Sequence, residues 1–311
     1  MSSFTRLFKT RYPRSLQSRF SLDTALLYSF HLSVYNQMPP DIQSQIDLFL
    51  LSGEHDPLFS SFDGVDLIDR CKSGHRTLVN ALKCKVATCE RQIRIPIPKG
   101  IPFDLRKFTR SKVEPMVRGL FRKVEQEKVL LLMDGCLVVL LPNTIQATID
   151  SADLGTAWKL ANLYLLSIDA EPISSEAPLI VGMSVGTRCY VSMSYFDQSQ
   201  PFDDYVVHEA AHLFHNAKRE PIGLPKLRRS EWLLPIAFSK RELFAYSCAV
   251  YSRILLISKD KRERLLEFEK AKDSFRPDDE RVDPDQLFFI LGEAVQARFG
   301  WKTILTHCAS C

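Results

Sequence analysis

Two histidines and a glutamate form the part of this sequence whose spacing could support chemistry. His208 and His212 lie four residues apart in YVVHEAAHLFHN, and Glu209 directly follows the first histidine. On a helix, this spacing puts both imidazoles on one face, so two ring nitrogens can reach a single metal ion. Glu209 is rotated by about a quarter-turn. From there its carboxylate can take a proton from water that the metal activates.

The residues around the motif predict a buried helix. Ala210 and Ala211 are small, and Leu213 and Phe214 are apolar. Buried histidine and glutamate side chains are unfavourable without partners, and a metal ion would offset that penalty. The alternative is a helix whose histidines bond backbone groups or line a surface. His215 lies near the same face, one turn further from the metal, so we expect it to support the site or fill the core.

The segment HEAAH at 208–212 resembles the active-site motif of the zincin metallopeptidases. A predicted hairpin at 179–196 precedes the motif helix, as in that family, and the resemblance covers roughly residues 179–258. It implies Zn²⁺ as the cofactor, bound by the two histidines, with the intervening glutamate as general base. It also implies an edge strand that lies beside the active-site helix and holds an extended peptide.

The resemblance also implies where a third ligand would come from. The metzincin branch is excluded, because His215 and Lys218 stand where it needs a glycine and a further ligand. The gluzincin branch uses a glutamate from a downstream helix, and Glu242 in SKRELFAYSCAVYS is the preferred candidate. Glu231 is the alternative, although Pro235 would break a helix there.

Glu242 has a second interpretation. Ser239 and Glu242 have the spacing of a capping box, in which the glutamate bonds back to the serine N–H and serves only the helix. For the oxyanion of the transition state, the family uses a Tyr, His or Arg from elsewhere. Tyr246, Tyr251 and His307 are candidates, and the sequence does not select among them.

The spacing of apolar residues, together with cap and turn residues, predicts the elements that position these side chains. The motif helix is expected over 203–220, with Asp203 or Asp204 as its N-cap. A hairpin turning at Gly186 precedes it, and a helix over 239–257 follows.

The rest of the chain is predicted to be mainly helical. The apolar run at 129–142 surrounds Asp134-Gly135 and predicts a second buried hairpin. The fold class is therefore α+β, a mainly helical chain with a small sheet or hairpins packed on the motif helix. Further helices are expected at 21–38, 41–53, 63–90, 111–127, 144–171 (long or broken), 259–273 (solvated) and 283–300.

Composition divides the chain into three parts. Residues 1–20 form a basic arm, 21–100 a helical N-terminal region, and 101–311 the zincin-like metallopeptidase domain. The boundary lies near 93–105, where three prolines and a glycine prevent a regular central element.

Charge and composition restrict the partners and the compartment. The chain has 311 residues, 45% of them hydrophobic, and a net charge of +4. No nucleic-acid partner is expected, although binding through the basic arm and 226–229 is a third hypothesis. No apolar run reaches the roughly 18 residues of a membrane span. The arm lacks the apolar core of a Sec-type signal, so we expect a cytoplasmic protein, unless the arm serves non-Sec targeting or secretion.

The eight cysteines do not form a disulfide scaffold, and we expect them to be reduced core residues. Cys308 and Cys311 near the end of the chain lack the second half of a metal site, so a site there is not expected.

These observations predict zinc-dependent hydrolysis of a protein or peptide substrate. Zn²⁺ would be held by His208, His212 and Glu242, with Glu209 as the general base. The alternative is a non-catalytic, zincin-like interaction protein with a structural or absent metal.

Overall fold

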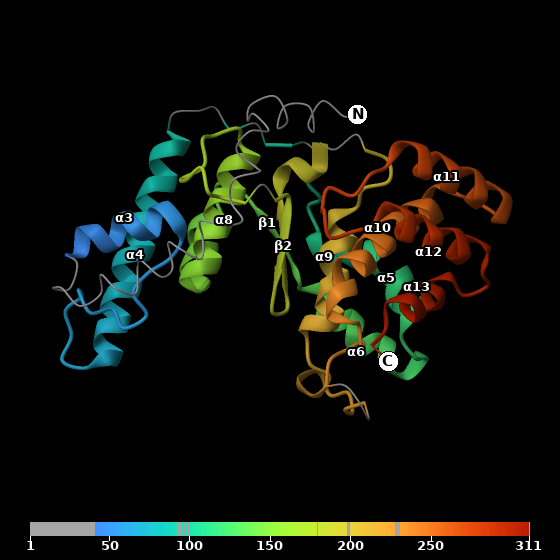
Figure 1. Ribbon diagram of the computed structural model, residues 1–311, viewed down its shortest axis with the longest axis horizontal. Helices are drawn as coiled ribbons and strands as arrows, with labels where there is room; N and C mark the ends of the chain where they lie inside the picture. Colours follow the sequence, from blue (N-terminus) through green and yellow to red (C-terminus); the bar gives the residue numbers. More distant parts are fainter. Residues whose placement is uncertain are drawn as a thin grey trace.

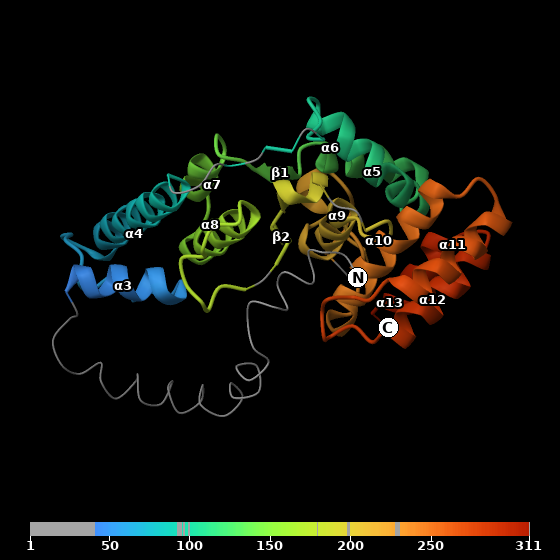
Figure 2. The ribbon, with the colours of Figure 1, turned by 90° about the horizontal axis from the view of Figure 1, so that it is seen from above.

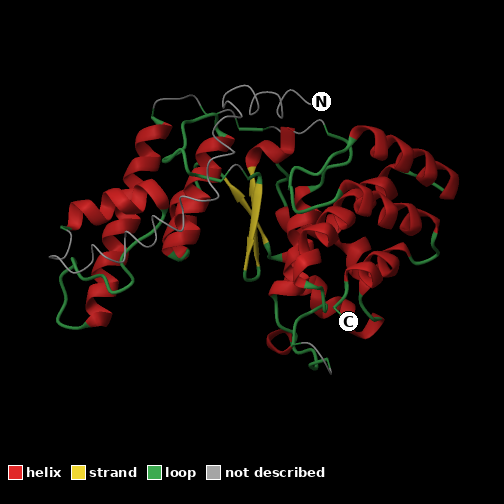
Figure 3. Ribbon diagram, in the orientation of Figure 1, coloured by secondary structure: helices red, strands yellow, loops and turns green. Residues whose placement is uncertain are grey.

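The computed structural model describes residues 41–91, 95, 97–98, 100–178, 180–197, 200–227 and 231–310. The basic arm at 1–20 and the predicted helix at 21–38 lie outside the described residues, as do Arg228, Arg229 and Cys311. In the described part, helices surround one small mixed sheet, so the predicted mainly helical α+β class is confirmed (Figure 3).

Aspartate N-caps set the start of many helices. In α3, α4, α5, α8, α9, α11 and α12, the side chain of the preceding aspartate accepts a backbone N–H of the first turn. Each cap satisfies a donor that has no partner inside the helix. The helices of the described residues are α3 (Ile42–Ser52), α4 (Leu67–Glu90), α5 (Leu105–Leu120), α6 (Lys123–Asp134), α7 (Ile145–Ser151), α8 (Leu154–Ser167), α9 (Tyr205–Asn216), α10 (Arg241–Ile257), α11 (Lys261–Ser274), α12 (Pro284–Gln296) and α13 (Gly300–Cys308).

The sheet has three strands in the order β1-β3-β2. β2 (Gly182–Val185) and β3 (Arg188–Ser192) form the predicted hairpin, and Gly186 takes the left-handed conformation (φ 58°) that its turn requires. β1 (Leu137–Leu140) pairs with β3 in parallel. β2 is therefore an edge of this sheet, and its outer backbone groups face away from β3.

The predicted hairpin at 129–142 is wrong. Its first half belongs to α6, where Val129, Leu130 and Met133 are buried, and Gly135 ends that helix instead of turning a hairpin. Only the second half is a strand, and it pairs with β3 across about fifty residues of chain. An apolar run around Asp-Gly fits a helix end as well as a hairpin turn, because both are commonly marked by such a pair of residues.

The predicted helix at 111–127 is also wrong in its bounds. α5 ends at Leu120 and α6 begins at Lys123. Phe121 interrupts them with an extended backbone, and its ring packs edge-on against Phe214 of α9 at 5.1 Å. Burying that ring favours the break, which local spacing does not reveal.

Three other helix predictions have mixed outcomes. The segment 144–171 is broken, with α7 and α8 separated at Ala152 and Asp153. The charged helix α11 buries only Phe268 and Ala271, as a solvated helix should. The last helix was expected to end at Gly300, but Gly300 begins α13. A Cβ there would collide with the Tyr251 hydroxyl, so packing explains this glycine.

The helices form two groups on either side of the sheet (Figures 1 and 2). α3, α4, α7 and α8 lie on one side, and α5, α6 and α9 to α13 lie on the other. α4 packs along α8, so the first helices contact elements from beyond residue 100. The boundary near 100 stays a prediction. Among the described residues, no helix has the length and apolarity that crossing a membrane requires.

Candidate metal centre

Asp204 fixes the first turn of α9. Its carboxylate accepts hydrogen bonds from the Val207 N–H at 3.2 Å, the Tyr195 hydroxyl at 3.0 Å and the Lys112 ammonium at 2.7 Å. Asp204 is 2% exposed. Such a buried anion is tolerated because Lys112 and the positive end of the helix face it. Of the two predicted N-caps, Asp204 is the one that α9 uses.

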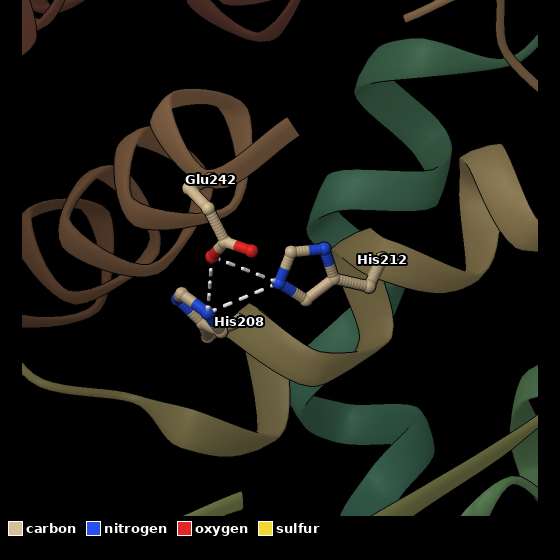
Figure 4. Close-up of side chains that lie close together, drawn as sticks. All are labelled: His208, His212 and Glu242. Atoms are coloured by element: carbon tan, nitrogen blue, oxygen red, sulfur yellow. Dashed lines mark hydrogen bonds and ion pairs between the residues drawn. The ribbon is translucent and has the colours of Figure 1, made fainter. Parts of the chain in front are cut away.

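The two motif histidines and Glu242 converge on one point (Figure 4). His208 Nε2 lies 3.2 Å from His212 Nε2. Glu242 Oε2 lies 3.6 Å from the first nitrogen and 3.4 Å from the second. The two helices that carry them, α9 and α10, pack against each other. Together the three side chains could hold a metal ion.

Glu242 reaches this point because α10 packs closely on α9. Ala245 and Ala249, on the same face of α10 as Glu242, are both buried. Burial by itself would raise the pKa of Glu242, but the adjacent side chains of His208 and His212 hold it well below its usual range. Its other oxygen, Oε1, lies 3.1 Å from Arg281 Nη2.

The capping-box interpretation of Glu242 is wrong. α10 has Lys240 as its N-cap residue, and no side chain caps it. Both carboxylate oxygens of Glu242 face other partners, the histidines on one side and Arg281 on the other.

The alternative third ligand, Glu231, lies elsewhere. The segment after α9 folds back on itself. Lys218 and Trp232 form an isolated antiparallel β-bridge, and the Leu233 N–H donates to the Ala217 carbonyl. Buried Arg219 supports this fold by donating to the Leu233 carbonyl at 3.0 Å. Glu231 is thereby held against Lys218, at 3.1 Å, and not beside the histidines.

Glu209 lies between the histidines and the edge of the sheet. It is 5% exposed. Gly182 of β2 leaves room for it, because a Cβ at that position would lie 2.9 Å from Glu209 Oε1. Burial raises the pKa of Glu209 to about 7, with a contribution from Glu242, while His212 and a hydrogen bond from Ser184 oppose the shift. A carboxylate with this pKa can both accept and donate a proton near neutral pH.

His215 supports His212 from behind. His215 Nε2 lies 2.9 Å from His212 Nδ1, and His215 Nδ1 lies 3.0 Å from Asn216 Oδ1. Burial, together with His212 and Arg241, lowers the pKa of His215 to about 4, so the ring is neutral at pH 7.

This chain of bonds selects a tautomer at each ring. The Asn216 oxygen can only accept, so His215 carries its proton on Nδ1 and accepts on Nε2. His212 then donates from Nδ1, which leaves its Nε2 lone pair directed at the point where His208, His212 and Glu242 converge. His215 therefore supports the site, one of the two roles that the sequence left open.

A cleft of about 710 Å³ opens over these residues. Of the three oxyanion candidates, only Tyr246 lines it, with its ring 4.6 Å from that of His208. Tyr251 packs on Trp301, and His307 pairs with Glu293.

The cleft includes residues that the sequence did not single out. Among them are Gly182 and Ser184 of β2, Arg241 of α10, and Arg281 from the segment before α12. No spacing rule connects Arg281 to Glu242, so only the folded chain reveals the contact.

No family model, curated protein or solved structure matches this chain. The predicted resemblance to zincins therefore rests on the sequence motif alone.

Proposed function

We propose that this chain is a zinc-dependent peptide hydrolase that acts as an endopeptidase. The observation that carries the proposal is the convergence of His208, His212 and Glu242 from two helices, with Glu209 beside them. Two imidazoles and one carboxylate form a donor set that catalytic zinc sites use.

The separations of the three ligand atoms support zinc. Zn²⁺ binds nitrogen and oxygen at about 2.0–2.2 Å, and tetrahedral ligands at that distance lie about 3.3–3.6 Å apart. Here the separations are 3.2, 3.4 and 3.6 Å. When bound, the ion would supply Lewis acidity, which polarises a peptide carbonyl and acidifies water.

The chain's own residues supply the proton transfers. Glu209 accepts a proton from water on a carboxylate oxygen and returns it to the nitrogen of the leaving amine. Tyr246, the oxyanion candidate that lines the cleft, would donate from its hydroxyl to the carbonyl oxygen as charge develops there.

The edge strand supports a peptide as the substrate. Gly182, Met183 and Ser184 of β2 line the cleft beside Glu209. No other described strand pairs with the outer edge of β2, so an extended chain could bond there, in the way that peptides extend exposed sheet edges.

One experiment tests the proposal. We expect the purified protein to bind about one zinc per chain and to cleave peptides from a mixed library. Glu209→Gln should retain the zinc and lower cleavage by about 10²–10⁴-fold, because the general base is lost while the ligands stay. Mass spectrometry of the peptides and elemental analysis of the metal measure both quantities.

Glu231→Gln is the matched control, because it removes the other candidate carboxylate at a site held by Lys218. It should leave zinc content and cleavage unchanged. A wild-type protein without zinc, or one whose cleavage survives Glu209→Gln, would contradict the proposal. Retained zinc without any cleavage would favour a non-catalytic interaction protein.

A further inference from the structure

The cleft contains an arginine that the proposed reaction does not use. Arg241 is the first residue of α10 and lines the cleft together with Phe238, His215 and Asn216. Its guanidinium lies over the Phe238 ring, 4.8 Å from the centroid. Phe238 is 82% exposed, although an aromatic residue usually gains from burial.

Arg241 has no anionic partner within the part of the chain that the structure describes. Its Nε atom is shielded from solvent and has no hydrogen-bond acceptor there. The other arginine of the cleft differs, since Arg281 pairs with both Asp279 and Glu242. A buried Nε–H without an acceptor is unfavourable, and a carboxylate that reached this N–H from the cleft would satisfy it.

Charge varies along the cleft. Besides burial, the negative charge of Asp278 raises the pKa of Asp203 and Tyr205 at the start of α9. In addition to burial, the positive charge of Arg241 lowers the pKa of His215 near the end of the same helix. Ten residues of helix separate these two positions, or about 15 Å. Asp279 and Glu280 also line the cleft near Asp278. An anionic group is therefore repelled from one end and attracted to the other.

We propose that Arg241 and Phe238 form a carboxylate-binding subsite of this cleft. The preferred peptides then carry a carboxylate near the scissile bond, on the side that faces the end of α9. The inference rests on the proposed peptide hydrolysis and specifies its substrate class. The carboxylate comes from an Asp or Glu side chain or from a free C-terminus. Arg241 binds either through two parallel N–H bonds, with the substrate chain packed on Phe238.

Three matched peptide pools test the subsite. The first has Asp or Glu at one fixed position and an amidated C-terminus. The second has Asn or Gln there, also amidated. The third has Asn or Gln and a free C-terminus. Binding is measured on the full-length, zinc-loaded Glu209→Gln protein, and cleavage on the zinc-loaded wild type.

We expect the protein to prefer the first or the third pool over the second by about tenfold or more, the usual effect of a charged hydrogen bond. Arg241→Met should abolish that preference, and Arg241→Lys should retain part of it. Arg241→Glu should instead favour a fourth, amidated pool with Lys at the fixed position. A preference for the first pool identifies a side-chain carboxylate, and one for the third identifies a chain end.

Arg298→Met is the matched control. Arg298 also stacks on an exposed ring, that of Phe299 at 5.2 Å, but it does not line the cleft. It should keep the wild-type preference. Equal binding of all pools, or a preference that Arg241→Met leaves intact, would overturn the subsite. Absence of cleavage would overturn the proposed hydrolysis instead, while the binding ratios would still decide the subsite.

Discussion

At the scale of single residues, the site depends on which atoms hold protons. His212 can offer its Nε2 lone pair only if Nδ1 is protonated, and His215 with Asn216 selects that tautomer. The two carboxylate oxygens of Glu242 also have different partners: Oε2 faces the histidines and Oε1 faces Arg281. The three proposed ligands include two, His212 and Glu242, that are oriented by neighbours outside the ligand set.

Replacing His215 should weaken metal binding. His215→Leu removes the acceptor for His212 Nδ1–H, so we expect the zinc dissociation constant to rise by about 10–100-fold. His215→Gln keeps an oxygen acceptor and should recover part of the affinity. Competition with a chromophoric chelator measures both constants. Equal affinity in the wild type and His215→Leu would show that the hydrogen bond does not orient the ligand.

At the scale of elements, the site depends on how closely β2 approaches α9. Gly182 is the point of contact, and Glu209 occupies the volume that a side chain there would need. The strand therefore sets the position of Glu209, the proposed general base, and presents an edge that no other described strand pairs.

Replacing Gly182 with a larger residue should lower kcat and leave the zinc content unchanged. In Gly182→Ala, the new methyl group would displace Glu209, and a shift of about 1 Å can lower a rate by about 10²-fold. The zinc content should stay the same, because no ligand touches Gly182. Gly135→Ala is the control, since no atom lies within 4 Å of a Cβ placed there. Equal kcat in the two variants would contradict this role of Gly182.

At the scale of the whole molecule, segments far apart in the chain meet around the cleft. Asp203 before α9 faces Asp278 before α12, with Asp204 also adjacent and Arg253 of α10 opposing their charge. Burial raises the pKa of Asp203 to about 7, and the two other carboxylates add to the shift.

This contact predicts a pH dependence of stability. The pKa of Asp203 is raised in the folded state, so the folded protein holds this proton more tightly than the unfolded chain. Its contribution to the free energy of unfolding is full below about pH 4, falls between about pH 4 and 7, and stays low above. Asp203→Asn should flatten that fall and stabilise the protein at pH 8 by about 1 kcal/mol, a value discounted for partial exposure.

Urea unfolding at pH 4, 6 and 8 would measure the effect, with Asp285→Asn on the surface of α12 as the control. The same pH profile for Asp203→Asn and the wild type would contradict the prediction.

Features with local signatures could be predicted from the sequence alone. Helical spacing was enough to put His208 and His212 on one face, and alternation with a glycine turn was enough to predict the hairpin before them. These features depend on contacts within a few residues, so the periodic pattern of the sequence is enough to predict them.

The remaining features depend on packing between distant segments. Whether Glu242 or Glu231 approaches the histidines depends on how α10 packs and on the fold-back that holds Glu231 against Lys218. The parallel pairing of β1 with β3 and the contact of Arg281 with Glu242 join segments that no local pattern connects. Side-chain packing between distant elements sets these contacts, and a single sequence does not display that information.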